Sequence, residues 1–169
     1  MKTLNLAILM LTLTGCVTEP ESTTFVLTND GDSDIFHDAN PRWMSLEVDG
    51  RPASFFEPGC MARCGALSGP IMCALAAEYP TVMRVRPGEQ SITQWDGTYY
   101  EVPEGRDCFR ERKADAEFSV SFCYSHEYEA IDGELGDVSG DSIGGAMVKD
   151  PVCEKQSFVR GEEVELLAE

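Results

Sequence analysis

Seven cysteines constrain this 169-residue chain more than any other feature of its sequence. Six of them lie between residues 60 and 153, and the seventh, Cys16, stands apart near the N-terminus. Six cysteines in an oxidising compartment predict three disulfides, although sequence alone leaves their connectivity open. The residues expected to form these bridges are Cys60, Cys64, Cys73, Cys108, Cys123 and Cys153.

The spacing of these cysteines suggests how they pair. We expect Cys123 to bond to Cys153, and the three early cysteines to hold one internal bridge plus one bridge to Cys108. Each bridge of this kind typically contributes about 2 to 4 kcal/mol to stability.

A zinc site is the alternative for the early cluster, because thiolates and imidazoles are zinc ligands. The spacing Cys60-x3-Cys64-x8-Cys73 lacks the paired short knuckles of zinc ribbons. The histidines, His37 and His126, lie far from the cluster in the sequence. We therefore expect disulfides here, and no metal or other cofactor.

The first sixteen residues have the anatomy of an export signal. The cationic Lys2 precedes an apolar run, Leu4–Leu13, and small residues then lead to Cys16. The run is much shorter than the roughly 20 residues that a helix needs to cross a bilayer. No later segment is apolar for long enough, so a permanent membrane span is not expected.

The tetrapeptide Leu13-Thr14-Gly15-Cys16 resembles the signal of bacterial lipoproteins. This resemblance implies that Cys16 is lipidated, that residues 1–15 are removed, and that several acyl chains hold the protein at a membrane. Val17 follows Cys16 where inner-membrane retention in enteric bacteria is associated with Asp, so we expect the outer membrane. The alternative is an ordinary signal peptide with a chance cysteine.

The expected organisation is then simple. Residues 1–15 form the signal peptide, residues 16–22 form a lipidated tether, and residues 23–169 form a single domain.

Charge excludes one class of partner. Thirty acidic residues against thirteen basic ones give a net charge of −17, which repels nucleic acid and anionic lipid headgroups. The expected contacts are the membrane, through the lipid anchor, and an envelope protein or peptide. One basic cluster, Arg106–Lys113, either pairs with the protein's own acids or meets an acidic partner.

Most of the remaining chain has the pattern of β-strands. Glu117–Tyr124 alternates aromatic or apolar residues with small ones, so one face is expected in the core and Cys123 on the other. Asp49-Gly50 between apolar segments indicates a hairpin. The other predicted strands cover residues 24–27, 43–48, 81–85, 91–95, 156–159 and 164–167. About eight strands with frequent turns predict an antiparallel β-sandwich.

Two segments depart from this pattern. Cys60–Tyr79 is rich in Ala, Leu and Met and predicts one or two short helices, which form a cysteine-rich insertion. Leu135–Val148 contains several glycines and predicts a mobile loop.

Val85–Gly97 with Ala116–Phe122 resembles the closing strands of immunoglobulin-like bacterial domains, including the BsuPI-type proteinase-inhibitor domain with its Pro-Gly-Glu turn and Trp-Asp-Gly. The resemblance implies an immunoglobulin-like β-sandwich. It implies less about function, because sandwiches host many unrelated roles.

A serine hydrolase is one alternative function. Gly140–Gly145 resembles a nucleophile segment around Ser142, with His37 or His126 as the base. No strong strand leads into this segment and no convincing helix follows it, so a flexible loop is expected instead.

A calcium-dependent adhesion module is the other alternative. Asp30, Asp32 and Asp34 alternate as in the first half of a calcium loop. The loop then has Ile35 where an EF-hand has Gly and Pro41 where it has Glu. A solvated turn is expected, and a calcium site shared with Asp137 or Asp141 is the alternative.

The aromatic side chains of Trp43, Trp95, Tyr99 and Tyr100 suit either a binding surface or a core, and the core is expected. No residue is assigned a catalytic role. The sequence therefore predicts a lipid-anchored envelope protein that binds or has a structural role and is not an enzyme.

Overall fold

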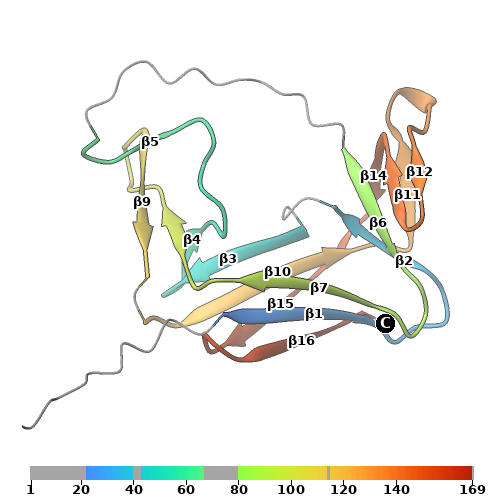
Figure 1. The fold of residues 1–169 in the computed structure, drawn as a ribbon, viewed down its shortest axis with the longest axis horizontal. Coiled ribbons are helices and arrows are strands. Elements are labelled where there is room, and N and C mark those ends of the chain that lie inside the picture. The colour runs from blue at the N-terminus through green and yellow to red at the C-terminus, as the bar shows by residue number, and fades with distance from the viewer. Residues whose placement is uncertain (1–21, 40–42, 67–79, 114, 169) are drawn as a thin grey trace, which may run out of the picture.

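The computed structural model describes residues 22–39, 43–66, 80–113 and 115–168 (Figure 1). Within these residues the chain is mainly β and contains several antiparallel sheets, consistent with a β-sandwich. The first main sheet has the order β16-β1-β7. It consists of β1 (Thr23–Asn29), β7 (Gln90–Trp95) and β16 (Glu163–Ala168).

The second main sheet has the order β15-β10-β3-β4. It consists of β3 (Met44–Val48), β4 (Arg51–Ala53), β10 (Phe118–Tyr124) and β15 (Val152–Phe158). The predicted hairpin joins β3 to β4, because Asp49 and Gly50 adopt the positive φ angles, 50° and 72°, that a two-residue turn requires.

The main core lies where these two sheets contribute buried side chains to one cluster. On β10, residues 118, 120, 122 and 124 are buried and the residues between them are partly exposed, which confirms the predicted alternation. Phe25 and Leu27 of β1 are fully buried. Trp95 of β7 contacts Phe118 edge to face, with ring centroids 5.4 Å apart. Aromatic side chains therefore join the two sheets.

One pairing in the two main sheets differs from the antiparallel expectation. β1 pairs with β16 in parallel, with Leu27 opposite Leu166, whereas β1 and β7 are antiparallel. Alternation places the buried residues of β16 on the core side in either direction, so the sequence pattern does not determine strand direction.

Two smaller sheets lie at one end of the molecule, on the right in Figure 1. One has the order β12-β13-β6-β2 and the other pairs β11 with β14. A second small core contains Phe36, Val82, Ile143 and Ala146. The strands are β2 (Ile35–Asp38), β6 (Thr81–Val85), β11 (Glu127–Ala130), β12 (Val138–Ser139), β13 (Ser142–Gly144) and β14 (Ala146–Lys149).

The mobile loop predicted for Leu135–Val148 is therefore wrong, because this segment contains β12, β13 and the start of β14. Its glycines serve close packing and turns. Gly145 has φ +66°, and a Cβ there would lie 2.9 Å from the backbone nitrogen of Gly136. Glycine permits this close approach of two backbones, so these glycines indicate tight packing rather than mobility.

The opposite end holds the sheet β5-β9-β8. It consists of β5 (Ala62–Arg63), β8 (Tyr99–Glu101) and β9 (Cys108–Arg112). β5 corrects the helical prediction for the first part of Cys60–Tyr79, and residues 67–79 lie outside the described residues. A short 3-10 helix, η2 (Ile131–Gly133), follows β11. No helix in the described residues is long and apolar enough to span a membrane.

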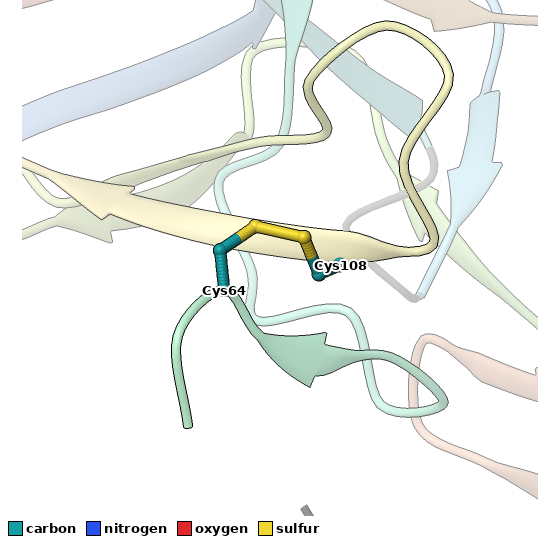
Figure 2. The surroundings of a disulfide bond; sticks show 2 residues. All are labelled: Cys64 and Cys108. Atoms are coloured by element: carbon teal, nitrogen blue, oxygen red, sulfur yellow. A yellow bond between two sulfur atoms is a disulfide. The ribbon is translucent and has the colours of Figure 1, made fainter. Parts of the chain in front are cut away.

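Two disulfides join the described strands. Cys123 and Cys153 lie directly opposite each other on β10 and β15, which confirms the predicted pair. Figure 2 shows the second bridge, from Cys64 after β5 to Cys108 at the start of β9. It confirms the expected link between the early cluster and Cys108. Cys60 is exposed and has no disulfide partner among the described residues, and Cys73 lies outside them.

Candidate ligand-binding groove

A groove of about 800 Å³ lies between β4 and β8, a volume within the range of small-molecule sites. We call it the β4–β8 groove. Its walls combine apolar, aromatic and charged side chains. The lining residues are 51–54, Pro58, 100–104 and Arg110.

Pro52 explains why the groove is open. The backbones of Ser54 and Tyr100 exchange two hydrogen bonds of 2.9 Å, which join β4 to β8 as an antiparallel bridge. The next bonded pair along this ladder would be Pro52 and Val102. Pro52 has no N–H to donate to the Val102 carbonyl, so this pair lacks one of its two bonds, and the ladder ends after one bridge.

The backbone N–H of Val102 forms no hydrogen bond with the described residues, and the residue is 47% exposed. Next to it, Pro52 and Pro103 present walls without N–H groups. The groove therefore combines apolar surface with an open peptide donor.

The hairpin of β8 and β9 forms the other wall and is fixed on both sides. Tyr100 packs edge to face on buried Phe109, with ring centroids 5.6 Å apart. β5 pairs with β9, and the disulfide of Cys64 to Cys108 ties the two together. Arg110 of β9 therefore projects from a braced strand.

Charge in the groove is unevenly compensated. Arg110 lies directly opposite Glu101 in the strand register, but Glu101 Oε2 pairs with Arg112 Nε at 3.3 Å. Neither Arg110 nor Arg51 forms an ion pair with an acid of the described residues. Glu104 also lines the groove and has no ion pair within the same residues.

Unpaired cations are the exception in this acidic chain. Of the lysines and arginines in the described residues, only Arg51, Arg106 and Arg110 lack an ion pair. The paired ones are Arg63, Arg84, Arg86, Arg112, Lys113, Lys149, Lys155 and Arg160. Two of the three exceptions line the β4–β8 groove.

The basic cluster Arg106–Lys113 has two expected roles, pairing with the protein's own acids or meeting an acidic partner. Its residues are divided between these two roles. Arg112 and Lys113 pair with the protein's own Glu101 and Asp96. Arg110 stays available in the groove. The sequence pattern indicates this cluster but not Arg51, because no local pattern shows that β4 and β8 come together.

Of the four aromatic residues considered for a core or a binding surface, three lie in the core and one lines the groove. Trp43, Trp95 and Tyr99 are at least 95% buried, which confirms the expectation of a core role. Tyr100 instead lines the groove.

The residues considered for a hydrolase lie on several elements. Ser142 is in β13, opposite Met83 of β6. His126 Nδ1 lies 3.2 Å from Ser33 Oγ. His37 is buried, with Nε2 3.0 Å from Ser91 Oγ and Nδ1 2.8 Å from the carbonyl oxygen of Asp38. Both ring nitrogens of His37 are thus occupied, and burial lowers the pKa of its imidazole.

Two of the aspartates considered for calcium, Asp34 and Asp141, face arginines. Asp34 Oδ2 lies 3.9 Å from Arg84 Nη1, and Asp141 Oδ1 lies 3.2 Å from Arg84 Nε and 2.8 Å from Arg86 Nη2. No group of three potential metal ligands occurs within the described residues. Asp30 and Asp32 lie in the solvent-exposed turn after β1.

The zinc alternative loses a ligand, because Cys64 is bonded to Cys108. Cys16 lies outside the described residues.

Fold and groove together define a mainly β, disulfide-containing protein with an open groove of ligand-binding size. Comparison with known proteins finds no matching family model, curated protein or solved structure. The resemblances to lipoprotein signals and to BsuPI-type domains therefore stay predictions.

Proposed function

We propose that this chain is a lipid-anchored protein of the cell envelope that acts by binding rather than by catalysis. The observation that carries the binding role is the β4–β8 groove, whose volume and mixed lining suit a ligand. Its two arginines lack ion pairs with the described residues, although the chain has more than twice as many acids as bases.

The disulfides support the envelope compartment. Bridges such as Cys64–Cys108 and Cys123–Cys153 are typical of oxidising compartments and rare in the cytosol. Neither bridge uses Cys16, the residue that the Leu13–Cys16 motif implies is lipidated. Val17 after Cys16 favours the outer membrane.

The finer fold is part of the proposal. We infer an immunoglobulin-like sandwich, supported by the contribution of both main sheets to one core and by β7 and most of β10, which lie within the resembling segments. A short helical insertion between β5 and β6 is supported by the Ala-rich composition of residues 66–77.

Membrane fractionation of the wild type and of Cys16→Ala tests the anchor. We expect the wild type in the membrane fraction and Cys16→Ala outside it, because only the Cys16 thiol can receive the lipid. Val17→Ala is the matched control and should stay at the membrane. Equal membrane association of Cys16→Ala and the wild type would contradict the proposal.

The membrane assignment has its own test. Val17→Asp, expressed in an enteric host, should move the protein from the outer-membrane to the inner-membrane fraction of a density gradient. An unchanged inner-membrane position for both proteins would overturn the outer-membrane assignment.

A further inference from the structure

We propose that the β4–β8 groove binds a short extended peptide that carries a carboxylate. The inference deepens the proposed binding role and rests on it, but it concerns the groove alone and not the anchor.

The arginines indicate the charge of the ligand. A guanidinium presents a planar set of N–H donors that matches a carboxylate. Arg110 cannot use Glu101, because that carboxylate pairs with Arg112, and Arg51 has no acid partner among the described residues. Both side chains line the same groove. A ligand carboxylate would supply the missing partner.

Glu104 limits how much negative charge the ligand can carry. Its carboxylate lines the groove and the whole chain has a net charge of −17. A polyphosphate or another strongly charged anion would be repelled by both. A peptide with a single carboxylate and an otherwise neutral or cationic body is compatible with them.

The backbone indicates that the ligand is a peptide. The antiparallel ladder stops at Pro52, and the Val102 N–H that would continue it has no partner among the described residues. The carbonyl of an extended peptide can accept this bond, as in ligands that add a strand to an open sheet edge. The walls formed by Pro52, Ala53 and Pro103, with the Tyr100 ring, suit apolar side chains flanking the carboxylate.

Affinity selection on the full-length protein, purified in a neutral detergent, tests the proposal. The probes are two pentapeptide libraries with randomised neutral flanks, one with a central Glu and one with a central Gln, and retention is quantified by mass spectrometry. We expect the Glu library to be retained about tenfold better, because one charge-assisted hydrogen bond supplies that ratio. Equal retention of the two libraries, or retention of neither, would overturn the proposal.

Two arginine variants test where the carboxylate binds. The double variant Arg51→Gln with Arg110→Gln should lose the preference for Glu over Gln. Arg106→Gln is the matched control, since Arg106 is also without an ion pair among the described residues but does not line the groove. A preference that survives in the double variant, or disappears in the control, would place binding elsewhere.

Pro52→Val tests the peptide edge without changing charge. Valine restores the missing N–H, so the ladder between β4 and β8 can continue to Val102 and close the groove. We expect retention of the Glu library to fall about tenfold while the protein keeps its far-ultraviolet spectrum. Wild-type retention in this variant would contradict the role of the open edge.

The anchor and the groove can fail separately. Peptide binding by a protein without lipid on Cys16 would leave the groove inference intact and remove the anchor. An acylated protein that retains no peptide would remove the groove inference and leave the anchor.

Discussion

Asn29 shows how one buried polar side chain organises a loop. It is fully buried at the end of β1, where Nδ2 donates to the carbonyl oxygens of Ser33 and Val85 at 2.8 Å each. Its Oδ1 accepts a bond from the Gly31 N–H at 3.1 Å. The loop that resembled a calcium site is therefore held by an amide.

Asn29→Ala should lower the free energy of unfolding by about 3 kcal/mol, because it leaves the buried Val85 carbonyl and the partly buried Ser33 carbonyl without their donor. Urea denaturation measures the change. Asp32→Ala, at an exposed position of the same loop, is the control and should change stability by less than about 0.5 kcal/mol. Similar losses in the two variants would show that Asn29 has no special role.

His37 should make stability depend on pH. Burial lowers the pKa of its imidazole in the folded state, with opposing contributions from Asp38, so the unfolded chain binds the proton more tightly. The contribution of His37 is complete above about pH 6.5 and is lost as the pH falls from there toward the lower folded pKa. Urea midpoints measured from pH 7.5 down to pH 5 should therefore decrease.

His37→Gln separates this effect from other titrations. The variant should be less stable at pH 7.5 and should show a shallower decline below pH 6.5. A decline as steep as that of the wild type would assign the pH dependence to other groups.

At the scale of elements, the turn between β7 and β8 depends on a glycine for two reasons. Gly97 has φ +80°, and a Cβ there would lie 2.8 Å from Cδ of Arg160, whose guanidinium pairs with Asp115. Gly88 has a similar φ of +75° but nothing within 4 Å of the added Cβ.

Gly88→Ala should therefore cost about 1 kcal/mol from backbone strain alone, and Gly97→Ala should cost more, because it also displaces Arg160. Thermal or urea denaturation of both variants measures the difference. Equal losses would mean that Arg160 moves aside without cost.

The disulfide between β10 and β15 should stabilise the second main sheet. Removing it with Cys123→Ala and Cys153→Ala should lower the free energy of unfolding by about 3 to 4 kcal/mol, the loop-closure value for its 30-residue separation. Ser121→Ala, on the same face of β10, is the control. A loss no larger than that of the control would show that β15 is held by strand pairing alone.

Elements were predictable from sequence where a strand has one buried face. Alternation identified β10, and Asp49-Gly50 identified the hairpin of β3 and β4, because both signals are local. Local pattern does not record strand direction, so the parallel pair of β1 and β16 was missed. It also does not distinguish glycines in tight β-turns from glycines in a loop, which is why β13 was missed.

At the scale of the whole molecule, the groove could not be predicted, because it depends on contacts between distant segments. Arg51 lies on β4 and Arg110 on β9, and the bridge between Ser54 and Tyr100 joins β4 to β8, the strand that pairs with β9. The sequence showed a surplus of arginines near residue 110. Only the ion pairs of the folded chain show which of these arginines lack an acidic partner among the described residues.

The cysteines connect the fold to its expected location. With Cys64 bonded to Cys108, the internal bridge predicted within the early cluster can only be Cys60 to Cys73. Cys16 is then the one cysteine left for lipid.

Mass spectrometry of peptides from the membrane-extracted protein, without reductant, tests this arrangement most directly. We predict an N-terminal peptide that begins with an acylated Cys16, together with the linked pairs Cys64–Cys108, Cys123–Cys153 and Cys60–Cys73. A chain that retains Met1 and carries free thiols at the positions paired in the structure would contradict the envelope location and the proposed function together.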